Sequence, residues 1–409
     1  MEFIESTSRL CVLFTVMWQR DGVIHREKFY GDKVNMWRDL LPGMLKTDLL
    51  GKQVGERVQV HVKSDEFFQP YQENLRRTVT PAQFLPLLAS NGDSVVEPVL
   101  GRYYPQSFLT GVPGVFRVSK APCRYLAKSG QNMVFDLNHP LADNDLTVSA
   151  KVLSISNGID ERGGRCEDWL EAICADGPGM QSPLPGAGSL YFEPRSLSRI
   201  DERDDGLFYG STRLVQHLDS TAREQISSGY RRILPADGAI LDCMASWDSH
   251  LDNDFSASTL TALGMNRQEL EHNGKADTIV VHDLNKSPQL PFADESFDGV
   301  VCTASIEYLK DPLTVCRELA RVLRRSGRVA ITFSNRWFPT KAVSIWSELH
   351  EFERLGMVLQ MIQSTGEFEG LETLSIRNFP RPENDTYSHL PHADPVYMVT
   401  ARKGKMESG

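Results

Sequence analysis

The sequence lacks any long hydrophobic run and any excess of positive charge. No stretch reaches the roughly 20 consecutive apolar residues that a membrane-spanning helix needs. The N-terminal residues show no basic region followed by an apolar run, so we expect no signal peptide and a cytoplasmic location. With a net charge of -10, the chain lacks the basic face with which proteins bind duplex nucleic acid. We therefore expect neither nucleic acid nor a membrane as a partner.

Cysteine is scarce, and its spacing shows no paired pattern. The chain has 7 cysteines and no Cys-x-x-Cys motif. An odd number without that spacing is typical of reduced thiols in a reducing compartment. The C-terminal residues 401–409 contain neither histidine nor cysteine. We predict no metal site from these patterns, while the sequence alone does not exclude one.

A length of 409 residues predicts two hydrophobic cores and a connector. Residues 1–155 are β-rich in pattern, and residues 156–206, rich in glycine and proline, are expected to form a linker with a short helix. Within the first part, residues 86–130 are expected to be an insert. Outside this insert, the pattern of residues 1–155 predicts strands at residues 10–18, 54–62 and 146–155.

From residue 207 onward, short apolar segments alternate with helical patterns. Candidate strands cover residues 239–242, 259–263, 278–282, 298–302 and 328–333, and residues 313–323 have helical spacing. This alternation predicts an α/β domain at 207–409, with a parallel-rich sheet and helices on both faces.

Four strings within residues 278–333 carry a recognisable order. They are Asp283, Leu-Pro-Phe-Ala-Asp-Glu-Ser-Phe-Asp at 290–298, Tyr-Leu-Lys-Asp-Pro at 308–312 and Arg-Val-Leu-Arg-Arg-Ser-Gly at 321–327. Together they resemble class I S-adenosylmethionine-dependent methyltransferases of the small-molecule type. The resemblance implies a Rossmann-like fold, S-adenosyl-L-methionine as cofactor and a small-molecule acceptor.

The segment after the first strand departs from that family, because residues 243–248 contain no glycine. Ser-Trp-Asp-Ser-His at 246–250 and Gly-Met-Asn at 264–266 resemble a subgroup with this altered turn. Ligands of such sheets bind beyond the carboxyl ends of the strands. The resemblance therefore implies cofactor-binding residues at Asp242, Ala245, Ser246, Trp247, Met265, Asn266, Asp283, Leu284, Thr303 and Arg213. Asn266 would bind the ribose hydroxyls through its amide.

The catalytic candidates are His250, Tyr308 and Arg336, which follow three different strands. His250 is a candidate general base, or alternatively a helix-start residue with a structural bond. Arg213 and His217 are four residues apart and would share one face of a helix. Arg213 could pair with the cofactor carboxylate or form a solvated salt bridge. We expect a thiol or sulfide acceptor, because thiolates need little beyond alignment and desolvation.

Several strings before residue 156 follow a second order. They are Leu-Pro-Gly-Met at 41–44, Leu-Gly at 50–51, Val-Gly-Glu at 54–56, Phe-Gln-Pro-Tyr-Gln-Glu-Asn-Leu at 68–75 and Phe-Asp-Leu-Asn-His-Pro-Leu-Ala at 135–142. These strings resemble SlyD-type FKBP peptidyl-prolyl isomerases. The resemblance implies a β-rich α+β FKBP-like domain at 1–155, with 86–130 in the place of that family's insert.

Isomerases of this family place an acid and a tyrosine at the rim of an apolar bowl. The resemblance puts His25 at the acid position, Phe68 at the tyrosine position and Val148 at an aromatic wall position. Leu41 and Met44 keep the floor apolar. Without the acid and the phenol hydroxyl, we expect weak isomerase activity or none. The domain could instead be a folding aid or an interaction module that contacts peptides.

Three interpretations of function stay open at this point. The chain could be an active methyltransferase with an accessory FKBP-like domain. It could be a binding or chaperone-like protein whose two sites have lost their chemistry. It could also methylate a protein that the N-terminal domain holds.

Overall fold

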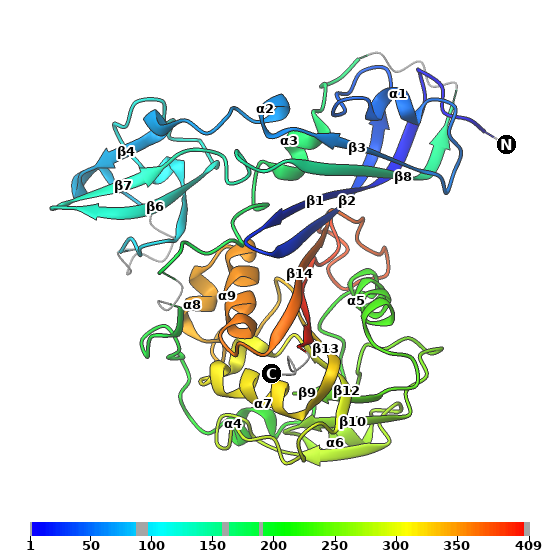
Figure 1. The fold of residues 1–409 in the computed structure, drawn as a ribbon. Coiled ribbons are helices and arrows are strands. Elements are labelled where there is room, and N and C mark those ends of the chain that lie inside the picture. Colours follow the sequence, from blue (N-terminus) through cyan, green and yellow to red (C-terminus); the bar gives the residue numbers. More distant parts are fainter. Residues whose placement is uncertain (1, 87–96, 158–162, 188–190, 405–409) are drawn as a thin grey trace, which may run out of the picture. The chain divides into compact units, whose positions relative to one another are not determined.

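The computed structural model describes residues 2–86, 97–157, 163–187 and 191–404, and the chain divides into two compact units (Figure 1). Unit 1 comprises residues 1–20, 29–189 and 350–356, and unit 2 comprises residues 21–28, 190–349 and 357–409. These bounds differ from the expected domains. Residues 21–28 belong to unit 2, and the expected linker is divided between the two units.

Unit 1 is built mainly from antiparallel strands, as the sequence pattern predicts. Its elements are β1 (Arg9–Arg20), β2 (Val23–Asn35, from Phe29 onward), α1 (Leu45–Leu49), β3 (Arg57–Val62), α2 (Ser64–Phe67), β4 (Arg76–Val79), β5 (Tyr103–Pro105), β6 (Pro122–Ser129), β7 (Asn132–Asp136), β8 (Leu146–Ser156) and α3 (Trp169–Cys174). The predicted strands at 10–18, 54–62 and 146–155 correspond to β1, β3 and β8. The predicted short helix corresponds to α3.

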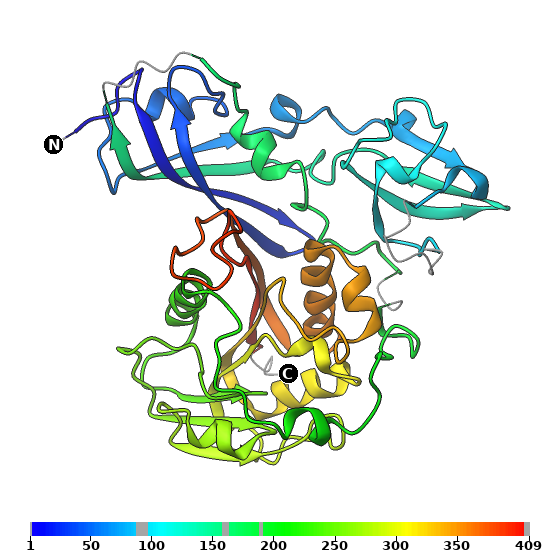
Figure 2. The ribbon, with the colours of Figure 1, turned by 180° about the vertical axis from the view of Figure 1, so that it is seen from behind.

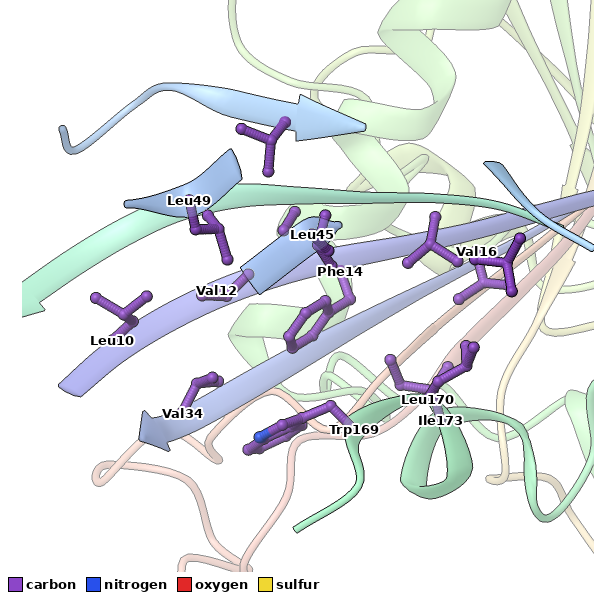
Figure 3. Packing of buried hydrophobic residues seen from close by; sticks show 14 of the residues in the cluster. Leu10, Val12, Phe14, Val16, Val34, Leu45, Leu49, Trp169, Leu170 and Ile173 are labelled. Carbon is purple, nitrogen blue, oxygen red and sulfur yellow. The ribbon is translucent and has the colours of Figure 1, made fainter. Parts of the chain in front are cut away.

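The larger sheet of unit 1 buries one face of β1. Alternate residues of β1 are buried, because successive side chains of a strand point to opposite faces. Phe14 stacks on Trp169 at the start of α3, with ring centroids 5.6 Å apart (Figure 3). Leu45 and Leu49 of α1 complete this core, and both are fully buried. The helices are short, so packing against the sheet stabilises them rather than their own propensity.

A second sheet of unit 1 (Figure 2) has the strand order β4-β7-β6-β5. It has its own apolar cluster. The cluster is rich in aromatic residues: Phe84, Tyr104, Tyr125 and Phe135 pack in it. The sheet includes β4 and β7, which lie outside the insert expected at 86–130. The sheet therefore extends beyond the expected insert, because β7 pairs with β6 of the insert and β4 pairs with β7. Of the insert itself, residues 87–96 lie outside the described residues.

Unit 2 contains the α/β sheet. Its elements are α4 (Asp205–Tyr209), α5 (Ser220–Ile233), β9 (Ala239–Cys243), β10 (Thr259–Gly264), α6 (Arg267–Glu271), β11 (Thr278–Val281), β12 (Phe297–Thr303), α7 (Pro312–Val322), β13 (Leu323–Phe333), α8 (Ser344–Glu348), α9 (Glu351–Gln363, from Met357 onward), β14 (Phe368–Arg377) and β15 (Val396–Lys403). All five predicted strands and the predicted helix are present within a few residues of their expected bounds.

The strand order in unit 2 is β11-β10-β9-β12-β13-β15-β14, followed by residues 23–28 of β2. The pairs from β11 to β13 are parallel, whereas β15 is antiparallel to both β13 and β14. The chain runs outward in one direction from β9 to β11 and in the other from β12 to β13. The order therefore reverses between β9 and β12, which is where sheets of this kind bind ligands.

The helical cover of this sheet is thinner than expected. Residues 244–258, which connect β9 to β10, form no helix in this fully described segment. The segment is rich in aspartate, serine and asparagine, whose side chains bond to nearby main-chain groups and disfavour helix interiors. His250 also has a left-handed main chain, with φ of +54°. Within the described ranges, no helix has the length and apolar character of a membrane span.

Candidate functional site

A cavity lies beyond the carboxyl ends of β9, β10, β11 and β12, at the reversal in strand order. Its empty volume is about 1220 Å³, including space open to solvent. All ten predicted cofactor-binding residues line it, and so do His250 and Tyr308. Lining residues that the sequence analysis did not assign include Tyr209, Gln216, Asp248, Glu269 and Asn285. The predicted site is therefore assembled around one cavity of unit 2.

The glycine-free turn after β9 still adopts a glycine-like backbone. Met244 has a φ of +60°, a left-handed conformation that L-residues other than glycine rarely adopt. Ala245 then donates its N–H to the carbonyl of Leu263 at 2.7 Å. A Cβ atom on Gly264 would collide with the main-chain oxygen of Ala245. The loop thus lies flat against the end of β10, and Gly264 is required for that close approach.

The side chain of Glu269 in α6 also holds this loop through a hydrogen bond. Its Oε2 atom accepts a hydrogen bond from Ser246 Oγ at 2.7 Å, and its Oε1 atom accepts one from the Arg213 N–H at 2.7 Å. Sequence analysis missed this residue. The signal was the spacing Asn266-x-x-Glu269, which is typical of a helix start with a capping pair. The carboxylate here turns away from its own helix and holds two other segments.

Asn266 has a different role from the expected one. Its Oδ1 atom caps α6 by accepting from the Glu269 N–H at 3.1 Å. Its Nδ2 atom donates to the carbonyl of Tyr209 at 2.8 Å. Thr212 Oγ1 lies 3.4 Å from Oδ1, but the one proton of this hydroxyl is better placed to be donated to Gln268 Oε1 at 2.7 Å. The expected binding of ribose hydroxyls by this amide is therefore limited to its second N–H and the second lone pair of Oδ1.

Asp242 and Asp283 of the cavity each have a buried oxygen without a hydrogen-bond partner. Asp242, at the end of β9, is 2% exposed, and its Oδ2 atom is buried and unpartnered. Burial raises the pKa of this carboxyl to about 7, and a hydrogen bond from Ser249 opposes the shift. Asp283, after β11, also has a buried Oδ2 without a hydrogen-bond partner, although Lys286 Nζ lies 3.8 Å from it. Such atoms are expected to accept hydrogen bonds from a ligand.

Comparison with known proteins agrees with this geometry. Residues 235–331 match the family model described as a methyltransferase domain. Unit 2 therefore contains a methyltransferase domain of the class I, S-adenosylmethionine-dependent kind. Ubiquinone/menaquinone biosynthesis C-methyltransferase UbiE of Bartonella henselae is 32% identical over 131 residues, which are 31% of this chain and 48% of that protein. Biotin biosynthesis bifunctional protein BioHC of Teredinibacter turnerae is 27% identical over 114 residues, or 27% of this chain and 20% of that protein.

The matches therefore span less than half the length of these curated relatives. A solved structure of an S-adenosylmethionine-dependent methyltransferase from Mesorhizobium loti is 16% identical, with a TM-score of 0.30. It covers 43% of this chain and 96% of its own.

The cavity of the methyltransferase domain fits the chemistry of S-adenosylmethionine, the cofactor of this family. The cofactor carries a cationic sulfonium and ammonium together with an adenine amino group, all of which favour nearby carboxylate oxygens. The unpartnered Oδ2 atoms of Asp242 and Asp283 supply such oxygens. Ala245 and Ser246, whose side chains are small, line the cavity beside the close approach to Gly264. The residues present therefore fit the cofactor.

The two aromatic catalytic candidates differ in what they can do. Burial lowers the pKa of His250, so its imidazole is neutral at pH 7 and can accept a proton. Tyr308 is buried, and its hydroxyl oxygen accepts a hydrogen bond from the Phe338 N–H at 2.9 Å. Burial raises the pKa of Tyr308 well above 10, so its phenol stays protonated at neutral pH. Of the two side chains, His250 is the one suited to act as a base.

Arg213 and His217 line the cavity from an irregular segment. Residues 210–219 form no helix between α4 and α5, so the expected shared helical face is wrong. The Arg213 guanidinium lies 4.6 Å from the centroid of the Phe208 ring and donates to the Phe208 carbonyl at 3.0 Å. The His217 ring packs edge-on against Phe338, with centroids 5.3 Å apart. Aromatic packing therefore holds this segment over the cavity.

Arg336 is the predicted site residue that is not among the described residues lining the cavity. Its Nε atom pairs with Asp394 at 2.9 Å, and its guanidinium lies 4.2 Å from the centroid of the Tyr387 ring. Asp394 is buried and also pairs with Arg381 Nη2 at 2.6 Å. Arg336 belongs to this charge cluster, which joins the end of β13 to the loop between β14 and β15. A catalytic role for it is not supported by this placement.

The positions expected for an isomerase pocket are divided between the units. His25 lies in unit 2, where it is buried and its Nδ1 is 2.8 Å from Thr373 Oγ1. Phe68 lies in unit 1 and stacks on His139, with centroids 4.0 Å apart. Met44 and Val62 line a separate open groove of unit 1. Within neither unit are the expected acid and tyrosine positions brought together.

Proposed function

We propose that the methyltransferase domain of unit 2 transfers the methyl group of S-adenosylmethionine to a small-molecule acceptor. The observation that carries the proposal is the cavity at the strand reversal, with the buried Oδ2 atoms of Asp242 and Asp283, which have no hydrogen-bond partner. When bound, the cofactor supplies an electrophilic methyl group. The side chains of this chain bind and align the reactants and exclude water from them.

Different residues of the cavity bind the reactants, align them and exclude water. Asp242 and Asp283 accept hydrogen bonds and complement positive charge, while Ala245 and Ser246 present the loop backbone. Trp247, Tyr209 and Phe338 supply aromatic walls. Alignment and desolvation lower the barrier of an in-line displacement without covalent help from the protein. His250 accepts the proton of an acceptor that must be deprotonated.

A thiol or sulfide is the acceptor class that we propose first. An ordinary thiol pKa of about 8.5 lies within reach of a neutral imidazole near pH 7, whereas the protonated Tyr308 is no base. An activated carbon acceptor is the second candidate. It is favoured by the UbiE relatives, whose name specifies C-methyltransferase.

Calorimetry and a labelled-methyl assay on the full chain test the proposal. We expect S-adenosylmethionine to bind and label to appear in product with sulfide or methanethiol. Label on oxygen or nitrogen acceptors only, in an assay that includes a panel of phenols, would contradict a thiol acceptor. The Asp283→Asn variant should bind the cofactor more weakly, and Asp294→Asn, at an exposed position, is the matched control. Absence of cofactor binding up to millimolar concentration would refute the transferase. Labelled protein without labelled small molecule, in a lysate, would favour a protein acceptor instead.

For unit 1 we propose an accessory role with weak isomerase activity or none. The proposal is supported by the changed rim positions, with His25 in place of an acid and Phe68 in place of a tyrosine. Their separate surroundings in unit 2 and unit 1 support it as well. A proline-containing tetrapeptide assay should show little acceleration by the full chain. Acceleration comparable to that by an active FKBP-type enzyme would contradict it.

A further inference from the structure

Asp248 lies between two side chains of the cavity wall. Its Oδ2 atom accepts a hydrogen bond from Gln216 Nε2 at 2.7 Å and is 3.6 Å from His250 Nδ1. Its Oδ1 atom accepts the main-chain N–H of His250 at 2.8 Å. One carboxylate therefore contacts both the backbone and the ring side of His250, while Gln216 fixes its orientation.

The two ring nitrogens of His250 have different surroundings. Nδ1 is fully buried and faces Asp248, and no hydrogen-bond partner satisfies it at the present distance. The His250 side chain is 15% exposed and lines the cavity, and since Nδ1 is fully buried, a bound acceptor would have to reach Nε2. A carboxylate beside Nδ1 favours a proton on that atom and leaves the lone pair on Nε2.

We propose that Asp248, held by Gln216, is a positioning residue that fixes the Nδ1–H tautomer of His250 and presents Nε2 as the proton acceptor. This inference rests on the proposed methyl transfer. In that step the acceptor's proton moves to His250 Nε2 and the acceptor's electron pair forms the new bond to the methyl carbon. The electrons of the broken carbon–sulfur bond stay on the sulfur. Asp248 then stabilises the imidazolium.

Two positive charges that face His250 oppose the effect of Asp248 on the pKa of this histidine. Burial lowers the pKa of His250, and Arg223 and Lys275 add to that lowering, whereas Asp248 raises it. Removing the Asp248 charge should therefore lower the pKa of His250 further. The alkaline plateau of activity would begin at lower pH in such a variant, but with a less populated reactive tautomer.

The loop itself offers a matched control. Asp252 lies four residues after Asp248, and its carboxylate pairs with Arg231. Asp252→Asn makes the same chemical change on the same loop without touching His250. His250→Gln assigns the His250 signal and reports the loss of the base.

Histidine-selective NMR on the full chain is the readout that does not depend on activity. We expect the ring ¹⁵N shifts of His250 to show the Nδ1–H tautomer in the wild type. In Asp248→Asn the pKa of His250 should fall and the tautomers should mix, while Asp252→Asn should match the wild type. An Nε2–H tautomer in the wild type, or an unchanged titration in Asp248→Asn, would overturn the proposal.

Steady-state rates give the second readout. We expect kcat to fall about 100-fold in His250→Gln, the usual contribution of a general base, and roughly tenfold in Asp248→Asn. Cofactor affinity and thermal midpoint should stay near wild type in Asp248→Asn. A loss confined to KM or to folding would overturn the positioning role. If the wild type binds no cofactor, the proposed function fails, whereas the NMR result still decides the His250 tautomer.

Discussion

The Glu269 carboxylate holds the loop that stands in place of a glycine-rich turn, because its Oε2 atom accepts a hydrogen bond from Ser246 Oγ at 2.7 Å. Family members with glycines obtain close backbone approach from the absence of side chains. Here Met244 is left-handed, Ala245 is small, and Ser246 is held by Glu269. The position of the loop therefore depends on a residue of α6 as well as on the residues of the loop.

Glu269→Ala should weaken cofactor binding. The variant removes the acceptor for Ser246 Oγ and for the Arg213 N–H. Each hydrogen bond to a charged group contributes about 1.5–3 kcal/mol, so we expect roughly a tenfold or larger increase in the Kd for S-adenosylmethionine. Calorimetry measures it. Glu271→Ala, which removes an exposed carboxylate from the same helix, should leave the Kd unchanged. Equal effects of the two variants would contradict the anchoring role.

At position 244 we expect a glycine substitution to leave the protein more stable than an alanine substitution does, which is the reverse of the usual order. Both Met244→Ala and Met244→Gly delete the side chain, so their difference isolates the cost of a φ of +60°. We expect the glycine variant to be more stable than the alanine variant by about 1 kcal/mol, measured from urea unfolding midpoints. Ala245, whose φ is not positive, is the control, because Ala245→Gly should destabilise by about 0.5–1 kcal/mol. A more stable Met244→Ala would contradict the left-handed conformation.

Asp242 should make the stability of the cofactor-free protein depend on pH. The pKa of its carboxyl is about 7 when folded, against an ordinary value of 3.8. The folded state therefore retains the proton that the unfolded state releases, and the wild type loses stability as pH rises from about 4 to 7. Asp242→Asn cannot ionise, so its advantage over the wild type in thermal midpoint should grow across that window and then level off. Asp254→Asn, an exposed change, should show no such trend.

Much of the fold and of the cavity could be predicted from the sequence. The strands of unit 2 are short apolar runs, and the motifs between them follow the carboxyl ends of neighbouring strands. In a parallel sheet those ends meet at one edge, so residues as distant as Asp242 and Leu284 line one cavity. The position of a motif relative to its strand was sufficient information for this.

The features that could not be predicted from the sequence depend on contacts between residues that are far apart in the chain. Arg336 follows β13 as predicted, but Asp394 pairs with it from 58 residues further on. Asn266 was expected to bind ribose hydroxyls through its amide, yet that amide caps α6 and donates to the Tyr209 carbonyl. The first residues of β2 belong to unit 2, which no local pattern indicates. Charge pairs between distant residues, and the division of one strand between two units, leave no periodic signal in a single sequence.

Gly264→Ala should damage both stability and cofactor binding. A Cβ atom at this position would meet the main-chain oxygen of Ala245, which cannot move without displacing the loop. Overpacking against backbone costs about 1–3 kcal/mol, and the displaced loop should narrow the cavity that Ala245 and Ser246 line. Urea unfolding and calorimetry with S-adenosylmethionine measure the two effects. Gly274→Ala is the matched control, since its added Cβ meets nothing within 4 Å. If both variants behave alike, the close approach of the loop to β10 is not required for binding.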